Sequence, residues 1–314
     1  MTTTSAPTIA TIGVHVLDTH VLGIESIPTG SDGQLVDTIR SSPAGTAGGT
    51  AVVLSRLGAA VRSQGAVGVD PLGDALLRAL DREGVDTSGI VRTETAQTSA
   101  SVIPVRPNGD RPAWHVIGAN GAFTLDDVDR SALDGCVHLH LGGPEFLGGA
   151  AAGELLAHAK AIGLSTSVDL LAPGDPGMLE WIAQALPHTD YLLPNDEQVL
   201  GFTGAGDLVS GARALVEAGV GCVAATRGKN GALVVTREDV LEVPAFRIGV
   251  VDTTGCGDAF SAGFVLGRAL GRSLGESARL GCATAAQVAQ GVGTDAGAYD
   301  LASVDGFAAT TPTW

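Results

Sequence analysis

Short apolar runs alternate with helical patterns through the middle and the C-terminal part of the chain, and this alternation limits the possible folds more than any other feature. Residues 136–141 have the pattern of a buried strand, and residues 149–162 that of a helix. Strand patterns follow at residues 165–171, 190–193 and 221–225. Repeated strand–helix units build a mainly parallel sheet with helices on both faces. In such α/β folds, ligands bind beyond the carboxyl ends of the strands.

Two stretches interrupt this alternation, because strand patterns occur there without helices between them. Residues 34–40 form one stretch, and residues 99–106 with residues 113–117 form the other. A small antiparallel sheet that stands off the main domain, as a lid, explains both. The sequence contains no linker, low-complexity tract or internal repeat.

A single domain is therefore expected over residues 1–314, with lid strands inserted at about 15–42 and 90–118. The chain is 45% hydrophobic and 17% charged, which favours a folded core over disorder. No window approaches 18 uninterrupted apolar residues, so we expect no transmembrane helix and no membrane partner. The first residues lack the basic and apolar regions of a signal peptide.

The charge and the cysteines exclude further classes. The formal net charge is −16, and a general nucleic-acid binder needs an excess of Lys and Arg instead. The four cysteines are widely spaced, with no Cys-x-x-Cys pair and no zinc framework. Reduced thiols in a cytoplasmic protein are the expected state.

One glycine-rich turn carries a chemical signal. Gly-x-Gly-Asp occurs at residues 204–207 and 255–258, and because the chain has 45 glycines, such a match alone means little. The second copy is preceded by Asp252-Thr253-Thr254, follows an apolar run and opens a helical pattern over residues 259–270. The first amides and the dipole of that helix favour an anion such as a phosphoryl group. Asp258, in the first turn, could accept a proton from a substrate hydroxyl or orient it.

The other copy has a simpler interpretation. Residues 204–207 connect two helical patterns, where an Asp that caps a helix is expected. No Gly-x4-Gly-Lys-Ser/Thr motif occurs, which excludes a Walker-type NTPase. The sequence therefore predicts a phosphoryl-transfer site at residues 252–258.

These motifs resemble those of the ribokinase family of carbohydrate kinases. Residues 252–264 look like the C-terminal signature of that family, and residues 47–58 with 65–74 look like the N-terminal one. The resemblance extends over nearly the whole chain. It implies a three-layer α/β/α sandwich with a mainly parallel central sheet and a small β-sheet lid.

The resemblance also implies the catalytic residues. Asp258 would be the catalytic base, and the amides of Gly255, Cys256 and Gly257 would form an anion hole for the transferring phosphoryl group. Phosphoryl transfer depends mostly on positioning and charge stabilisation, so one base and a few backbone amides are sufficient.

Cofactor positions follow in the same way. Asp252 and Thr254 match positions that hold a monovalent cation, usually potassium, in many family members. ATP would be the donor, accompanied by Mg²⁺, which needs few direct protein ligands. The nucleotide-side residues implied by the resemblance are Asn195, Thr226, Gly228 and Gly231.

On the acceptor side, Asp18 matches a carboxylate that hydrogen-bonds sugar hydroxyls. Gly48 and Gly49 would let the sugar approach the backbone, and Asn120 would face the sugar. Arg40 is the only Lys or Arg among the first 55 residues, which favours a neutral acceptor over a phosphorylated one. Three lid arginines leave a phosphorylated acceptor open as the alternative. These are Arg92, Arg106 and Arg111.

Three positions depart from the family pattern. Val53 stands where the family has an Asn that contacts the sugar, and Gln198 stands where it has the Glu of an Asn-x-x-Glu motif, with Glu197 beside it. Gly142 and Gly143 follow the central strand where ribokinase itself has a sugar-binding Glu, which weakens ribose as the preferred acceptor.

Three aromatic and imidazole side chains remain without an assigned role. His138 and His140 alternate on one strand, a spacing that can bind metal but that more often belongs to satisfied, buried histidines. Trp114 could stack on a sugar ring or pack the lid.

The sequence therefore predicts an ATP-dependent carbohydrate kinase that phosphorylates a hydroxymethyl group of a sugar or sugar-like small molecule. Two alternatives stay open. One is a nucleoside kinase of adenosine-kinase type, and the other is a non-catalytic sugar-binding protein of the same fold. An exposed face of the lid could pair two copies of the chain into a homodimer.

Overall fold

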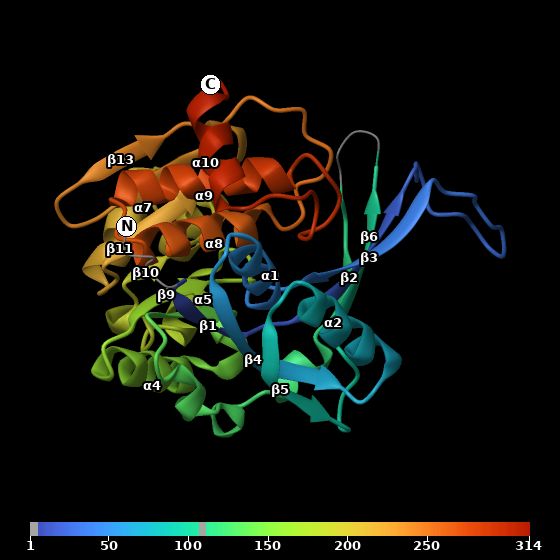
Figure 1. Cartoon of the computed structure of the whole chain (residues 1–314), viewed down its shortest axis with the longest axis horizontal. Helices are drawn as coiled ribbons and strands as arrows, with labels where there is room; N and C mark the ends of the chain where they lie inside the picture. Colours follow the sequence, from blue (N-terminus) through green and yellow to red (C-terminus); the bar gives the residue numbers. More distant parts are fainter. Residues whose placement is uncertain (1–5, 107–110) are drawn as a thin grey trace.

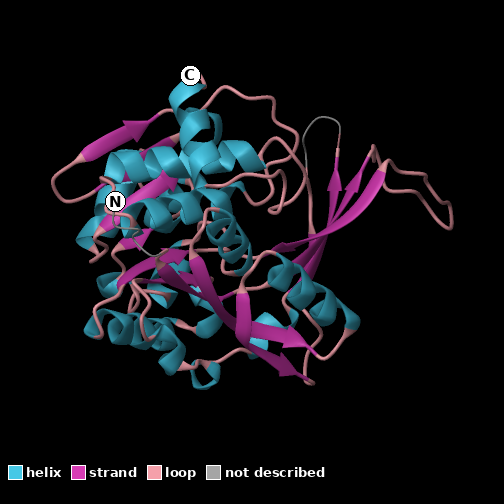
Figure 2. Cartoon of the chain, in the orientation of Figure 1, coloured by secondary structure: helices cyan, strands magenta, loops and turns pink. Residues whose placement is uncertain are grey.

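The structure is a computed structural model that describes residues 6–106 and 111–314. Within these residues a nine-stranded sheet crosses the molecule, with helices on both of its faces (Figures 1 and 2). The strands, in spatial order, are β13 (Val240–Val243), β12 (Ala232–Val235), β11 (Cys222–Thr226), β10 (Tyr191–Leu192), β9 (Ser165–Asp169), β8 (His138–Gly142), β1 (Thr8–Gly13), β4 (Ala60–Gly68) and β5 (Asp86–Thr93).

The strands from β11 to β5 run parallel, and β12 and β13 extend the sheet in antiparallel orientation. A parallel sheet is covered on both faces, so its strands are continuous apolar runs rather than alternating ones. β11, for example, is apolar and buried from Cys222 to Ala225. The mainly parallel α/β sandwich predicted from the sequence is confirmed.

Two apolar cores lie on opposite faces of the sheet. In one core, Phe260 and Phe264 pack with Ile9 of β1. In the other, Leu155 packs with Leu139 of β8. The helices of the first face are α1 (Gly48–Arg56), α2 (Pro71–Arg82), α8 (Cys256–Ala269), α9 (Leu274–Val288) and α10 (Leu301–Thr310). Those of the second are α4 (Gly149–Ala161), α5 (Pro176–Trp181), α6 (Asp196–Thr203) and α7 (Leu208–Glu217).

Short helices complete the described elements. They are α3 (Pro144–Leu147) and the 3₁₀ helices η1 (Gly118–Ala122), η2 (Leu125–Asp127), η3 (Arg130–Leu133), η4 (Leu186–His188) and η5 (Gly228–Asn230).

The first Gly-x-Gly-Asp copy connects two helices, as the sequence predicted. Gly204 ends α6 in the left-handed region, with a φ of 65°. Asp207 caps α7, because its side chain accepts a hydrogen bond from the amide of Ser210 at 2.9 Å. A helix-capping Asp satisfies an amide that the helix leaves free. The capping interpretation of residues 204–207 is therefore confirmed.

A second sheet projects from the main body (Figure 2). Its four strands are β3 (Thr38–Ala44), β2 (Val16–Leu22), β6 (Ala100–Val105) and β7 (Trp114–Val116), in that order. We call these strands the lid. Residues 107–110, which fall within the predicted lid segment 90–118, lie outside the described residues.

Two details of the lid prediction are wrong. The first lid strand predicted at residues 34–40 is β3, which begins only at Thr38 and continues to Ala44. The lid is also not purely antiparallel, because β2 and β6 pair in parallel. Both strands leave the body of the molecule in the same direction, β2 directly after β1 and β6 after β5. In the described part of the chain, no helix combines the length and the apolarity needed to cross a membrane.

Candidate active site

The predicted site residues gather at the carboxyl ends of the parallel strands. The register aligns Gly13, Gly142 and Asp169 at the ends of β1, β8 and β9. Beside them, Asn195 forms a parallel bridge with Thr226, the last residue of β11. The N-terminal part of α8 reaches this edge, where Ser261 donates to Asp169 at 3.0 Å. Acceptor-side and nucleotide-side residues thus border one edge of the sheet, as expected for an α/β fold.

Asp258, in the first turn of α8, lies against the glycine pair that begins α1. A methyl group added at Gly49 would come within 2.8 Å of Asp258 Cγ, and closer still to Oδ2. The hydroxyl of Thr50 lies 3.5 Å from the Asp258 carbonyl oxygen. The absence of a side chain at Gly49 therefore leaves room for the Asp258 carboxyl group. Gly48 packs beside His15, whose Cδ2 would be 3.0 Å from an added methyl group.

The Asp258 carboxyl group belongs to a cluster of acidic side chains. Burial, followed by the negative charges of Asp169 and Asp18, raises the pKa of Asp258 well above its usual value. Burial also raises the pKa of Asp169 to about 7, against the hydrogen bond from Ser261. The pKa of Asp18 is raised as well, because burial has a larger effect than the opposing hydrogen bond from Ser101. A carboxyl group with a raised pKa is a stronger base than an ordinary aspartate, which suits it to take a proton from a hydroxyl group.

Sequence reasoning missed Asp169. It lies within the strand predicted at residues 165–171 and is the last residue of β9, and a carboxylate at the carboxyl end of a strand is itself a signal of a site, because ligands bind there in parallel sheets.

The turn before α8 presents free amides. Gly255 caps the helix in the left-handed region, with a φ of 77°, and an added methyl group would lie 2.6 Å from Thr294 Cα. The Cys256 amide donates to Thr253 O at 3.2 Å. Within the described residues, the amides of Gly255, Gly257 and Asp258 donate to no backbone acceptor. The free donors thus include two of the three predicted ones, and the Asp258 amide joins them.

The Cys256 thiol is not activated by the helix terminus. Burial raises its pKa to about 12, and its Sγ lies 3.6 Å from Ala285 O. Burial outweighs the helix dipole here, so the thiol stays neutral.

The two predicted cation-site residues contact each other in the loop before α8. Asp252 Oδ1 accepts hydrogen bonds from both the amide and the hydroxyl of Thr254, each at 2.9 Å. The Asp252 residue is only 3% exposed.

A row of polar side chains crosses the lid on the face that carries Asp18. The strand register aligns Ser42, Asp18, Ser101 and His115, one on each strand. His115 Nδ1 and Ser101 Oγ lie 2.9 Å apart. Because Asp18 also acts on the pKa of Asp258, this face of the lid is turned toward the carboxyl cluster.

The side chain of Asn120 hydrogen-bonds to backbone groups at the base of the lid. Its Oδ1 accepts from the amide of His15 at 3.1 Å, and its Nδ2 donates to the carbonyl of His15 at 3.0 Å. These two bonds fix the connection between β1 and β2. The structure gives Asn120 this positioning role, and its predicted contact with the acceptor stays a prediction.

The nucleotide-side residues lie at the carboxyl ends of β10 and β11. Gly231 has a φ of 82° and closes the turn after β11, where an added methyl group would lie 2.7 Å from the Ala245 amide nitrogen. Gly228, with a φ of 52°, faces open space. An exposed Asn195 and a half-buried Thr226 complete the set.

Gln198 has a structural role at its departure from the family pattern. Its side-chain oxygen accepts a hydrogen bond from the backbone amide of Asn195, and the side-chain oxygen of Asn195 accepts one from the backbone amide of Gln198. The two residues thereby cap the start of α6. Its Nε2 also donates to the carbonyls of Leu170 at 2.9 Å and Ala172 at 2.8 Å. An ionised glutamate could not make the last two bonds, so this site is built for glutamine.

The other unassigned residues have simple environments. His138 contacts the hydroxyls of Ser165 and Ser167, both at 2.7 Å, and His140 contacts Ser167 at 2.8 Å. The described residues hold no group of three His, Cys, Asp or Glu side chains arranged to bind a metal ion. Both histidines are thus satisfied and buried.

Val53 is fully buried in the α1 core. Trp114 is 55% exposed on β7, on the lid face opposite the polar row.

Comparisons with known proteins agree with this geometry. The pfkB family carbohydrate kinase profile matches residues 15–300. A deoxyribokinase of Salmonella typhi is 29% identical over 217 residues, covering 67% of this chain and 69% of the relative. An uncharacterized sugar kinase of Archaeoglobus fulgidus is 30% identical over 250 residues, covering 78% of this chain and 97% of the relative.

Solved structures share the fold. An Arabidopsis thaliana ribokinase complexed with ribose and ATP superposes with a TM-score of 0.82 at 22% identity, covering 97% of this chain and 99% of the other. The match of the family profile to most of the chain identifies it: the protein belongs to the pfkB family of carbohydrate kinases.

Proposed function

We propose that the protein transfers the γ-phosphoryl group of ATP to a hydroxymethyl group of a neutral sugar or sugar-like acceptor, with Asp258 as the general base. The observation that carries this proposal is the position of the Asp258 carboxyl group beside the free amides at the start of α8. The base would take the hydroxyl proton, while the amides of Gly255 and Gly257 would stabilise charge on the moving phosphoryl group.

The polar row on the lid supports a polyhydroxylated acceptor. Asp18 and Ser101, together with His115 and Ser42, offer acceptors and donors along one face. Closure of such a lid over the acceptor excludes water, which would otherwise compete for the phosphoryl group. A nucleobase needs an apolar or aromatic slot instead, and the exposed Trp114 lies on the opposite face. A sugar is therefore favoured over a nucleoside.

The arginines near the site support a neutral acceptor. Arg40 forms an ion pair with Asp295 at 2.8 Å, and Arg92 forms one with Asp74 at 2.7 Å. Arg111 donates to the Thr254 hydroxyl at 3.2 Å, next to the amides rather than to the acceptor row. These guanidinium groups already have protein partners, which makes them less available to a second phosphate on the acceptor.

ATP would enter on the side of Asn195, Thr226, Gly228 and Gly231. Mg²⁺ would supply charge neutralisation on the phosphates, held mainly by phosphate oxygens and water, which is its usual mode with nucleotides. Gln198 is not among its ligands in this proposal, because its side-chain oxygen and nitrogen are both bound to backbone groups. The monovalent cation predicted at Asp252 and Thr254 is not part of the proposal, since N–H and O–H donors already occupy the oxygens there.

The test is ADP release with Mg-ATP over a panel of pentoses, deoxypentoses, hexoses, sugar acids, phosphosugars and nucleosides. We expect acceptor-dependent ADP production that falls about 10²- to 10⁴-fold in Asp258→Asn, the usual contribution of a general base. Asp207→Asn is the matched control, because it makes the same change in the other Gly-x-Gly-Asp copy. Saturable sugar binding without turnover in the wild-type protein would instead favour the non-catalytic alternative.

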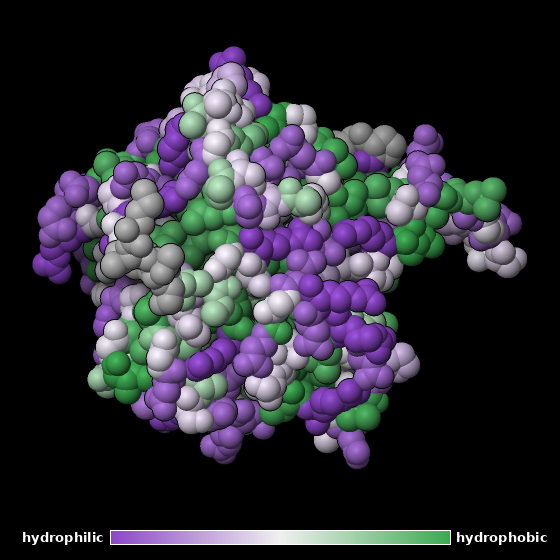
Figure 3. Space-filling view, viewed as in Figure 1, coloured by the Kyte–Doolittle hydropathy of each residue, from purple (hydrophilic) through white to green (hydrophobic). Residues whose placement is uncertain are grey.

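We also propose that two copies pair through the outer face of the lid, and that the protein is cytoplasmic. Ile39, Val102 and Trp114 share that face and are 68%, 43% and 55% exposed. Figure 3 shows hydrophobic residues gathered on the projecting part of the molecule where the lid lies. Such an exposed apolar face favours association.

The four cysteines are all free, in keeping with a reducing compartment.

Size-exclusion chromatography with light scattering tests the pairing. Val102→Asp would place charge in the apolar face and is expected to convert a dimer to a monomer. A wild-type protein that elutes as a monomer at micromolar concentration would contradict it.

A further inference from the structure

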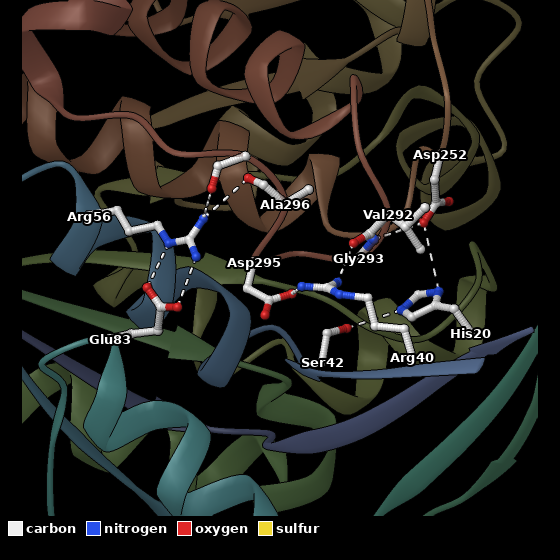
Figure 4. Close-up of polar contacts among 11 residues, drawn as sticks. His20, Arg40, Ser42, Arg56, Glu83, Asp252, Val292, Gly293, Asp295 and Ala296 are labelled. Atoms are coloured by element: carbon white, nitrogen blue, oxygen red, sulfur yellow. Dashed lines mark hydrogen bonds and ion pairs between the residues drawn. The ribbon is translucent and has the colours of Figure 1, made fainter. Parts of the chain in front are cut away.

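The carboxylate of Asp252 is surrounded by hydrogen-bond donors. Its Oδ1 accepts from Thr254 N and Oγ1, and its Oδ2 accepts from the amide of Gly293 at 3.1 Å. His20 Nδ1, from lid strand β2, lies 3.7 Å from the same Oδ2. The side chain of Asp252 is 1% exposed. A buried carboxylate needs such compensation, and here two loops and the lid provide it (Figure 4).

One peptide group links this carboxylate to a guanidinium group. The Gly293 amide points at Asp252, while the carbonyl of the same peptide, that of Val292, accepts a hydrogen bond from Arg40 Nη1. In a trans peptide the N–H and the C=O point in opposite directions. Asp252 and the Val292 oxygen therefore lie on opposite sides of this peptide, and the two cannot ligate one ion together.

Arg40 belongs to lid strand β3 and reaches over the loop that follows α9. Besides Val292 it contacts Asp295, whose Oδ1 lies 2.8 Å from Nη2. A methyl group added at Gly293 would lie 2.9 Å from Arg40 Nη1, so glycine at that position lets the guanidinium approach the backbone. Figure 4 shows Arg40 between Asp295 and Val292, with His20 between Ser42 and Asp252.

The donor set does not fit a monovalent cation. Such an ion replaces its water shell by bare carbonyl and carboxylate oxygens. Here the oxygens of Asp252 and Val292 already accept hydrogen bonds, and Thr254 Oγ1 both donates to Asp252 and accepts from Arg111. A permanent positive charge, that of Arg40, is in place as well.

We propose that Arg40 supplies the positive charge that a monovalent cation would otherwise provide beside Asp252, so that this protein works without potassium. Arg40 is a positioning residue: it acts through the 292–293 peptide on Asp252, and Asp252 holds Thr254 at the start of the turn that carries the free amides. The part of the test that measures activity rests on the proposed kinase function, and the part that measures stability does not.

The experiment compares potassium with tetramethylammonium, a cation too large to be ligated by this loop, at equal ionic strength. ADP release and the thermal unfolding midpoint, Tm, are measured in both salts. For the wild-type protein we expect rates equal within twofold and no difference in Tm. Arg40→Ala is expected to lose at least tenfold in kcat in tetramethylammonium and to regain at least threefold on adding potassium, with a Tm that potassium raises. Arg40→Lys, which keeps the charge, is expected to stay indifferent to potassium.

Arg56→Ala is the matched control. Arg56 holds the other end of the same loop through the carbonyls of Ala296 at 3.2 Å and Gly297 at 2.9 Å, and pairs with Glu83 at 2.6 Å (Figure 4). Its removal is expected to lower Tm without creating a response to potassium, which separates loop stability from charge.

Several results overturn the proposal. One is a wild-type rate or Tm that potassium raises selectively, by more than threefold or by more than 2 °C. Another is an Arg40→Ala protein with the wild-type rate in tetramethylammonium. If no acceptor yields ADP, the proposed function fails, and the Tm comparison of wild type and Arg40→Ala decides this inference by itself. If Arg40→Ala does not fold, the wild-type and Arg40→Lys comparisons decide it.

Discussion

Replacing Gln198 by glutamate restores the residue of the family pattern, and we expect it to destabilise this protein. Gln198 Nε2 donates to the carbonyls of Leu170 and Ala172, and Oε1 accepts from the amide of Asn195. An ionised glutamate keeps only the last of these bonds. Two carbonyl oxygens would then lose their donor and face a negative charge at a residue that is 7% exposed.

The size of the effect follows from these contacts. Each buried carbonyl left without a donor costs about 1–3 kcal/mol, so the pair costs roughly 2–6 kcal/mol. A loss of about 3 kcal/mol corresponds to a fall in Tm of roughly 4–6 °C for a domain of this size. Burial and the two carbonyls raise the pKa of the new carboxyl group, and its protonated form can donate to one of them. The deficit is therefore largest at pH 8 and shrinks as the pH falls through that pKa.

Thermal and urea unfolding at pH 5 and pH 8 measure this deficit. Gln198→Met removes the donors without adding charge and should show a smaller deficit that does not depend on pH. Glu197→Gln changes an exposed neighbour and should leave Tm within about 1 °C. A Gln198→Glu protein as stable as the wild type at pH 8 would refute the role assigned to Gln198.

Three further predictions concern the carboxyl cluster and the turn before α8. Gly49→Ala should lower kcat at least tenfold while Tm changes by only a few degrees, because the new methyl group displaces the Asp258 carboxyl group; an unchanged kcat would contradict this. Asp169→Asn should exceed the wild type in stability by a margin that grows between about pH 4 and pH 7 and reaches up to about 4 kcal/mol at pH 8.5, because Asp169 ionises near pH 3.8 in the unfolded chain but only near pH 7 in the folded protein. The same variant should move the acid limb of kcat/KM to lower pH, since it removes a negative charge that raises the pKa of Asp258. The Cys256 thiol should resist iodoacetamide at pH 8 in the folded protein, as mass spectrometry can check, because its pKa is near 12.

The sequence predicted those elements whose signals are local. The apolar run that forms β11 and the helical pattern of α8 can each be identified from neighbouring residues, because burial on both faces requires uninterrupted apolar runs. The sequence also predicted correctly that the Gly-x-Gly-Asp copy at residues 204–207 caps a helix. Asp207 caps a helix, which depends only on residues within one turn.

The features that escaped prediction depend on contacts between distant segments. The parallel pairing of β2 with β6 joins residues far apart in sequence, and strand periodicity does not specify a partner. The place of Asp169 in the acidic cluster requires α8 to bring Ser261 and Asp258 to the end of β9. Similarly, the bonds between Asn120 and the His15 backbone exist only because η1 returns to the base of the lid.

The charges at the candidate site constrain the acceptor further than any single residue does. Asp18, Asp169 and Asp258 each have a raised pKa, and the first and second both raise that of the third. An anionic group placed among them would add to this repulsion, whereas hydroxyl groups that donate to the carboxylates would relieve it. Because Asp18 is carried by the lid and Asp258 by the main body, one acceptor that donates to both would stabilise the closed lid. The same electrostatics that disfavour the ionised form of the base in the empty site thus favour a neutral acceptor with several hydroxyl groups.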